Sequence, residues 1–400
     1  MKADKKQSKL IILLCAAVYM ISYVTRNSYN AIISEMVTST GLTKSALSAA
    51  LTGAFISYGA GQLVSGYFGD KVQPRTLIAI GLATTSCMNL LIPLCQNPWQ
   101  MTAVWCLNGF AQSFMWPPIV KILFCALSPE DYSIGCVRVS WGSSLGNILV
   151  YLTAPLLILT LGWKSVFAVS SAVGILGLIF WLKLCPKIDL RQSGKAAKKA
   201  NASSSAVFAA TLVLVMIGII LQGILKDGVT TWMPSYISET FGVRNEISIL
   251  SGVFLPMFAI LCYSVCNFLY LKIRQPLVCS SLIFGVSTVI CCALYCLSDS
   301  SAILSVAFSS IITGCMHGVN LMLIGIAPTI FAKSGNVSTF SGILNCTAYI
   351  GSALSSYVIP LITENSGWKS TLLLWLFLSA AGVIVCASSI RLWKAMNQQQ

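Results

Sequence analysis

The chain has 400 residues, of which 56% are apolar (AVILMFWYC) and only 9% are charged. Soluble domains carry about 25% charged residues, so this composition excludes a soluble globular protein and favours a chain whose solvent is the lipid bilayer. The formal net charge of +14 does not indicate nucleic-acid binding, because most basic residues fall in short gaps between apolar runs and no basic–aromatic motif accompanies them.

Apolar segments long enough to span about 30 Å of hydrocarbon recur along the whole chain. The first continues into Arg26 and Asn27 without a small-residue cleavage site, which predicts a retained helix rather than a signal peptide. We therefore expect an all-α membrane protein with twelve transmembrane helices. The expected spans are 10–33, 44–67, 76–95, 100–125, 135–159, 162–183, 206–236, 247–271, 276–297, 301–330, 337–361 and 368–391.

The distribution of basic residues predicts how the chain is oriented. Most of the 25 Lys and Arg residues lie at the two ends, in the long polar stretch near the middle and in alternate gaps between spans. The positive-inside rule then places both termini in the cytoplasm. The short loops favour a bacterial inner membrane.

A polar stretch at residues 184–205 divides the chain almost in half. Its composition indicates a flexible, basic cytoplasmic linker between two six-helix bundles, at residues 1–183 and 206–400. The halves repeat each other at an offset of 205 positions, and this predicts two pseudo-symmetric bundles, an arrangement found in transporters. The repeated features are Gly-Trp-Lys-Ser at 162–165 and 367–370, Pro155 with Pro360, and Gly146 with Gly351.

The gap after the second span carries the sequence GYFGDK at positions 66–71. It resembles the Gly-x-x-x-Asp-Arg/Lys motif of the major facilitator superfamily, where the motif stabilises one access state. We expect Asp70 to form a charged clamp with Lys71 and Arg75 at a cytoplasmic helix end, and Gly66 to let two helices touch. The matching segment of the second half has basic residues but no aspartate, so we expect the clamp in the first half alone.

Three basic residues fall inside spans: Arg26 in the first, Lys121 in the fourth and Lys226 in the seventh. Arg26 and Lys226 form a pair. Their offset of 200 is close to that of the duplication, which predicts that they are symmetry mates facing each other across the repeat interface. A charge inside the membrane costs a few kcal/mol and is rarely retained without a function. The alternative is that each side chain snorkels to a membrane interface.

Helical spacing favours the functional interpretation of Arg26. Tyr19, Tyr23 and Arg26 follow an i, i+4, i+7 pattern that puts two phenols and a guanidinium on one stripe. Tyr58 and Gln62 share a face of the second span. A guanidinium opposed by an ammonium, with phenol donors nearby, suits a phosphate or a carboxylate.

The chain resembles the organophosphate:phosphate antiporters, a family that includes glycerol-3-phosphate and hexose-6-phosphate transporters. The likeness is most specific at YVTRN (23–27), at 58–75, at MWPP (115–118) and at KDGVTTWMPSY (226–236). The resemblance implies that Arg26 and Lys226 take the places of the two arginines that grip the phosphate. It also implies that four tyrosines line the cavity: Tyr19, Tyr23, Tyr58 and Tyr349.

Five residues depart from that family's pattern and leave the particular substrate open. Lys226 replaces an arginine and so keeps a cation without the bidentate fork. Gln62 stands in place of a lysine, Leu145 in place of a histidine, and His317 in place of a tyrosine. Asp227 adds a carboxylate that can offset the neighbouring cation or bind a proton.

Two further residues each leave two interpretations open. Lys121 lies one turn beyond the Trp-Pro-Pro kink at 116–118 and matches a basic position of the family. It either contacts the substrate cavity or snorkels to an interface. His317, the sole histidine, is either a structural residue in an apolar helix or a donor in the cavity.

The sequence predicts no cofactor and no metal, and it contains neither a catalytic triad nor a phosphate-cradling Walker loop. Nearly all of the 16 cysteines lie in apolar stretches without the spacing of a metal site, so we expect small buried side chains and no disulfide. Catalysis and ATP-driven transport are therefore not expected.

The predicted function is secondary transport of a small organic anion by alternating access, most simply a phosphate ester in exchange for inorganic phosphate, by a monomer in the lipid bilayer. Two unpaired cations in an empty cavity would slow its closure, because a buried charge needs a partner, and this predicts exchange. Two alternatives remain: proton-coupled transport of another organic solute, for which Asp227 is the motive, and a membrane sensor of a phosphate ester that does not transport it.

Overall fold

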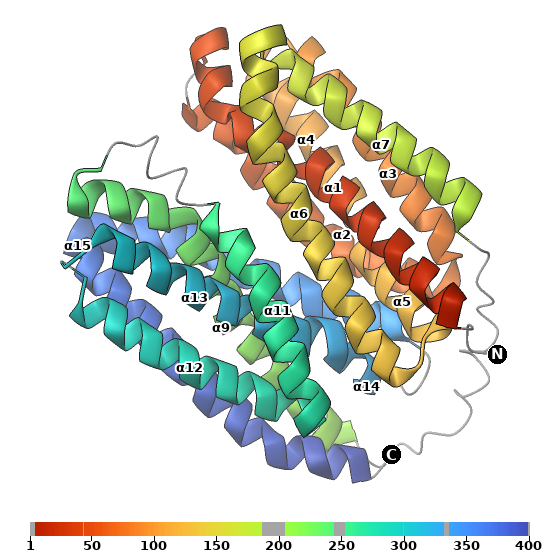
Figure 1. The fold of residues 1–400 in the computed structure, drawn as a ribbon, viewed down its shortest axis with the longest axis vertical. Helices are drawn as coiled ribbons and strands as arrows, with labels where there is room; N and C mark the ends of the chain where they lie inside the picture. Colours follow the sequence, from red (N-terminus) through yellow and green to blue (C-terminus); the bar gives the residue numbers. More distant parts are fainter. Residues whose placement is uncertain are drawn as a thin grey trace. The chain divides into compact units, whose positions relative to one another are not determined.

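The computed structural model describes residues 5–42, 44–185, 205–243, 253–298, 300–331 and 336–398. Throughout these residues the regular structure is helical (Figure 1), which confirms the expected all-α fold. The predicted linker, apart from its first and last residues, lies outside the described residues. The chain divides into two compact units, residues 1–196 with 331–346 and residues 197–330 with 347–400.

The first unit holds the N-terminal helices, coloured red to yellow-green in Figure 1. The expected span 100–125 is two helices rather than one, because α4 ends at Gln112 and α5 begins at Trp116 with Pro117 and Pro118 in its first turn. The helices are α1 (Lys5–Thr40), α2 (Lys44–Lys71), α3 (Pro74–Leu91), the short η1 (Ile92–Leu94), α4 (Pro98–Gln112), α5 (Trp116–Ala126), α6 (Pro129–Leu161) and α7 (Lys164–Leu184).

The second unit holds the helices from α9 onward, and α15 contributes to both units. Gly367 interrupts α15 with φ 74° and ψ 176°, so that α15 supplies the last two expected spans. The turns of α15 up to residue 346 belong to the first unit. The helices are α9 (Ser205–Phe241), α11 (Phe254–Ile273), α12 (Pro276–Cys296), α13 (Ala302–Asn320), the π-helical η4 (Leu321–Ile326), α14 (Ala327–Phe331) and α15 (Val337–Gln398).

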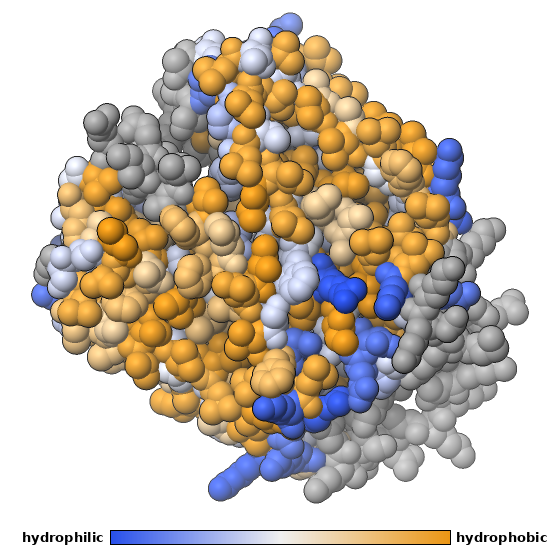
Figure 2. All heavy atoms as spheres, in the orientation of Figure 1, coloured by the Kyte–Doolittle hydropathy of each residue, from blue (hydrophilic) through white to orange (hydrophobic). Residues whose placement is uncertain are grey.

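Nine helical stretches among the described residues are long and apolar enough to cross a membrane. The expected spans outside this set are α2, the broken pair α4 and α5, and the first part of α15. These contain many Gly, Ser and Thr residues or are individually short. Figure 2 shows that the visible surface is predominantly apolar, with many exposed Leu, Ile, Val and Phe side chains, as a surface facing lipid requires.

Matching helix pairs occur in the two units, and glycines bring their backbones together. In the first unit α1 runs alongside α6, and a Cβ atom on Gly146 would collide with the carbonyl oxygen of Met20. In the second unit α9 runs alongside α15, and a Cβ atom on Gly351 would collide with the carbonyl oxygen of Ile220. The same contact thus recurs at nearly the offset found in the sequence, as expected for a duplicated fold.

Candidate functional site

Arg26 lies in α1 of the first unit, and three aromatic rings surround its guanidinium. The Cζ atom is 4.2 Å from the ring centroid of Tyr58, 5.6 Å from that of Tyr23 and 5.9 Å from that of Phe55. Tyr23 precedes Arg26 on α1, whereas Phe55 and Tyr58 project from α2. Cation–π attraction acts within about 6 Å of a ring centroid, so these three rings hold the guanidinium in place.

The aromatic cluster around Arg26 extends to the start of α5. The rings of Tyr19 and Tyr23 lie 5.1 Å apart, and the rings of Tyr19 and Trp116 lie 5.3 Å apart. The contacts along α1 are those that the i, i+4, i+7 spacing predicts. Tyr19 and Trp116 are buried, so they support Tyr23 and through it the position of Arg26.

Gln62 lies one turn beyond Tyr58 on α2 and is completely buried. Neither its Nε2 nor its Oε1 atom has a hydrogen-bond partner among the described residues. A buried amide without a partner costs about 1–3 kcal/mol, and such a group in a folded protein needs an explanation. A polar ligand that hydrogen-bonds to the amide is one such explanation.

A buried polar network next to Arg26 was not identified from the sequence. Gln112 Nε2 donates hydrogen bonds to Thr25 Oγ1 at 2.9 Å and to Thr85 Oγ1 at 2.8 Å, and Asn89 Nδ2 donates to the Thr25 carbonyl oxygen at 2.9 Å. The network joins α1, α3 and α4 and fixes α1 one residue before Arg26. The available signal was the pair Thr85 and Asn89, which lie four residues apart and so on one face of the third expected span.

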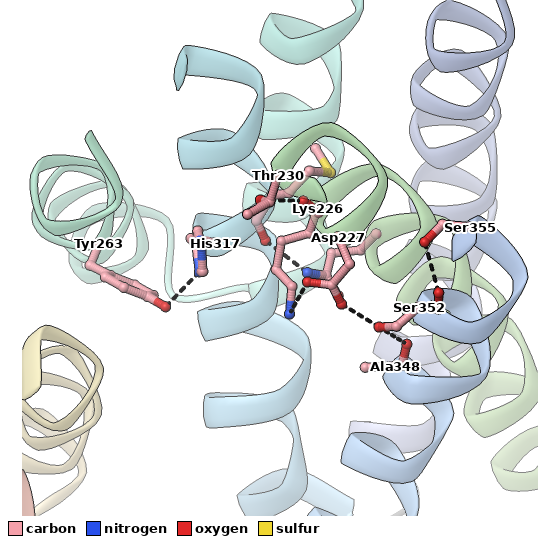
Figure 3. A network of polar contacts seen from close by, with 10 residues as sticks. Lys226, Asp227, Thr230, Tyr263, His317, Ala348, Ser352 and Ser355 are labelled. Atoms are coloured by element: carbon pink, nitrogen blue, oxygen red, sulfur yellow. Dashed lines mark hydrogen bonds and ion pairs between the residues drawn. The ribbon is translucent and has the colours of Figure 1, made fainter. Parts of the chain in front are cut away.

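The second unit contains an ion pair between neighbouring residues of α9. Lys226 Nζ lies 3.4 Å from Asp227 Oδ1, and the two side chains are 17% and 32% exposed. The hydroxyl of Ser352 on α15 donates a hydrogen bond to Asp227 (Figure 3). Of the two roles left open for Asp227, the structure shows the first: the carboxylate offsets the neighbouring cation, so Lys226 is not an unpaired charge.

His317 on α13 lies between Tyr263 and the Lys226–Asp227 pair in the view of Figure 3. The Tyr263 hydroxyl and His317 Nδ1 are hydrogen-bonded at 2.8 Å. Tyr349 is half-buried on α15, whereas Leu145 on α6 is exposed. Because Arg26 belongs to the first unit and Lys226 to the second, their convergence on one ligand stays a prediction.

The clamp predicted around Asp70 forms with a different cation. Lys121 Nζ of α5 donates to Asp70 Oδ1 at 2.9 Å, with side-chain exposures of 2% for Lys121 and 9% for Asp70. Lys71 instead contacts the Tyr67 hydroxyl, and Arg75 donates to the carbonyl oxygen of Leu182. The predicted pairing of Asp70 with Lys71 and Arg75 is therefore wrong. Of the two interpretations of Lys121, snorkelling is wrong because the side chain is buried, and contact with a substrate cavity stays a prediction.

Asp70 also caps the first turn of α15, within the first unit. Its carboxylate accepts hydrogen bonds from the Ser338 N–H at 3.2 Å, the Thr339 N–H at 2.8 Å and the Thr339 hydroxyl at 2.7 Å. Helix N-termini present free N–H groups and attract negative charge. Gly66 makes this approach possible, since a Cβ atom there would lie 2.9 Å from the Ser338 carbonyl oxygen.

The model of one protein family, described as Major Facilitator Superfamily, matches residues 15–274. The chain belongs to the major facilitator superfamily. Among curated relatives, the membrane sensor protein UhpC of Salmonella typhimurium is 24% identical over 95% of this chain and 90% of its own. The glycerol-3-phosphate transporter of Bacillus subtilis is 23% identical over 82% of this chain and 80% of its own.

Solved structures of the superfamily share this fold. The proton:xylose symporter XylE bound to 6-bromo-6-deoxy-D-glucose aligns with a TM-score of 0.77 at 12% identity, covering 96% of this chain and 95% of that one. Together with the apolar helices, the family membership makes this a multi-pass membrane protein. The resemblance to organophosphate:phosphate antiporters is confirmed at the level of named relatives.

Proposed function

We propose that this major facilitator is a secondary transporter that carries a phosphate ester in exchange for inorganic phosphate. The main support for this proposal is the position of the Arg26 guanidinium in a membrane helix. Its Cζ atom lies 4.2 Å from the ring centroid of Tyr58. Guanidinium donors match the geometry of a phosphate. The names of two relatives agree with this proposal: the glycerol-3-phosphate transporter of Bacillus subtilis and a probable hexose phosphate transport protein of Chlamydia trachomatis.

In this proposal Arg26 and Lys226 bind the same anion, one from each unit, as the two six-helix bundles alternate access. Gln62 supplies an amide that has no hydrogen-bond partner among the described residues. Four tyrosines line the path of the anion: Tyr19, Tyr23, Tyr58 and Tyr349. Hydrogen bonds to charged groups contribute about 1.5–3 kcal/mol each, so inorganic phosphate and a phosphate ester compete for the same donors. This common requirement is the basis of exchange.

The proposal includes the setting of the protein. It is a monomeric carrier rather than an enzyme, with a small anion and the lipid bilayer as its partners. It lies in the cell membrane with both termini in the cytoplasm, which the distribution of basic residues supports.

Counterflow tests the proposal directly. Purified protein is reconstituted into liposomes that contain inorganic phosphate, and uptake of labelled phosphate is measured against a panel of external phosphate esters and carboxylates. We expect phosphate-dependent uptake that phosphate esters inhibit more strongly than carboxylates. Uptake that is indifferent to internal phosphate and to every ester of the panel contradicts the proposal.

A second candidate function is a sensor of a phosphate ester, because a relative that spans 95% of this chain is named a membrane sensor protein. The same binding residues would serve either function. Saturable phosphate-ester binding to the purified protein, together with no flux in the same liposomes, favours the sensor; flux at a rate above that of protein-free liposomes favours the transporter.

A further inference from the structure

The carboxylate of Asp227 forms the ion pair with the Lys226 ammonium that a bound anion would otherwise form. The carboxylate lies 3.4 Å from the Lys226 ammonium and also accepts the Ser352 hydroxyl (Figure 3). An anion that approaches the ammonium while Asp227 is ionised brings a second negative charge to one cation. Like charges that share a site favour protonation of one of them.

The surroundings of Asp227 show which groups respond to pH. On its own helix α9 the charged neighbour is Lys226. On α13 the titratable neighbour is His317, whose ring is hydrogen-bonded to Tyr263 of α11. Ser352 and Ser355 of α15 are polar but do not titrate in the physiological range, and η4 (Leu321–Ile326) brings apolar side chains. Among the residues labelled in Figure 3, the carboxylate is that of Asp227.

We infer that Asp227 is a proton acceptor that alternates with the transported anion as the partner of Lys226, so that each anion crosses together with one proton. This inference rests on the proposed function. On the loading side a hydronium ion gives its proton to the Asp227 carboxylate, and the carboxyl group and a water molecule result. On the other side the carboxyl group returns its proton to water as the anion leaves. Ser352 fits both forms, because a hydroxyl group can donate to a carboxylate or accept from a carboxylic acid.

This arrangement changes the cost of moving the empty carrier. In the empty form Lys226 is paired with ionised Asp227, and in the loaded form it is paired with the anion while Asp227 is neutral. Neither form closes over an uncompensated lysine, which is the costly state. The protein therefore carries out net uptake driven by a pH gradient in addition to exchange, and Asp227 is the residue that permits the return of the empty form.

Two transport modes with labelled inorganic phosphate test the inference in reconstituted full-length protein. Exchange is measured in liposomes filled with phosphate, and net uptake in phosphate-free liposomes with an acidic exterior. Asp227→Asn keeps the size of the side chain but removes the proton site and leaves Lys226 uncompensated in the empty form. We expect this variant to lose net uptake about tenfold or more relative to its own rate of exchange, because the empty carrier then closes over a buried charge.

The matched control is Glu239→Gln, which makes the same charge change on the same helix at an exposed residue that bonds to Trp368 Nε1 at 2.7 Å. It should behave as the unmodified protein in both modes. Net uptake by Asp227→Asn at the unmodified rate overturns the inference, although exchange would still support the proposed function. A lack of phosphate exchange and binding in the unmodified protein overturns both.

A spectroscopic readout separates the role of Asp227 from the titration of phosphate itself. Infrared difference spectra recorded on addition of phosphate should show a new protonated carboxyl band in the unmodified protein and in Glu239→Gln, and no such band in Asp227→Asn. Phosphate binding without that band in the unmodified protein contradicts the inference.

Discussion

The ammonium of Lys121 lies 2.9 Å from the carboxylate of Asp70, and their side chains are 2% and 9% exposed. The same carboxylate binds the N–H groups of Ser338 and Thr339 at the start of α15. One aspartate therefore connects α2, α5 and α15 within the first unit. Loss of one partner of a buried ion pair leaves the other charge uncompensated, and this is more costly than loss of both.

The Lys121–Asp70 pair predicts strong coupling in a double-mutant cycle. Lys121→Met and Asp70→Asn should each destabilise the protein by about 3–5 kcal/mol, whereas the double variant should lose less than the sum of the two. Thermal unfolding of the purified protein in one detergent measures the effect as a drop in Tm. Lys71→Met is the control, because the Lys71 side chain is exposed and contacts Tyr67. A strictly additive cycle is the contrary result.

The sequence predicted contacts between residues that are close together in the chain or that recur in both halves. The contacts of Tyr19, Tyr23 and Arg26 follow from helical spacing, and the repeated glycines Gly146 and Gly351 follow from the duplication. The contacts along α1 join residues within two helical turns, and the glycine contacts occur at matching positions of the two halves.

Contacts between residues far apart in the chain were not predictable in the same way. The Asp70–Lys121 pair joins residues 51 positions apart, and the cap on Thr339 joins residues 269 positions apart. Lys71 and Arg75 are nearer to Asp70 in the sequence. An exposed charge at a helix end is solvated by water, however, and gains little from forming an ion pair. For Asp227 the sequence left two roles open, pairing with Lys226 or binding a proton, and side-chain rotamers rather than spacing bring the two groups together.

Arg26 predicts a loss of transport without a loss of fold. Arg26→Ala should abolish phosphate exchange in liposomes, because the guanidinium is the donor in the first unit. Arg26→Lys keeps the charge without the bidentate fork and should retain a fraction of the activity. Arg138→Ala, which removes an exposed arginine from α6, should exchange phosphate as the unmodified protein does. Size-exclusion profiles must show folded protein in all three, and normal exchange by Arg26→Ala would refute the role of this residue.

Gln62 and Gln112 predict opposite effects of the same substitution on stability. Gln62→Leu replaces a buried amide that has no hydrogen-bond partner in the described part of the chain with an apolar group of similar size, so Tm should be unchanged or higher. Gln112→Leu removes two hydrogen bonds and leaves Thr25 and Thr85 without them, so Tm should fall. Equal losses of Tm in the two variants would show that the Gln62 amide is already bonded inside the folded protein.

The ligand-binding role of Gln62 is tested separately in the stable Gln62→Leu variant. If the amide bonds to the transported anion, its removal should weaken phosphate binding about tenfold, the equivalent of roughly 1.4 kcal/mol. Isothermal titration of the detergent-solubilised protein with inorganic phosphate measures this change. An unchanged affinity would assign Gln62 to packing and not to the site.

The duplicated glycines predict equal sensitivity at matching places in the two units. Gly146→Ala and Gly351→Ala each push a methyl group into a carbonyl oxygen of the partner helix, and overpacking of this kind costs about 1–3 kcal/mol. Gly285→Ala is the control, since a Cβ atom there meets nothing within 4 Å, and alanine favours a helix over glycine by about 0.8–1.0 kcal/mol. Tm should therefore fall for the first two variants and hold or rise for the third. Because each contact lies within one unit, the double variant Gly146→Ala with Gly351→Ala should show additive losses, and a strong departure from additivity would mean that the two helix pairs do not unfold independently.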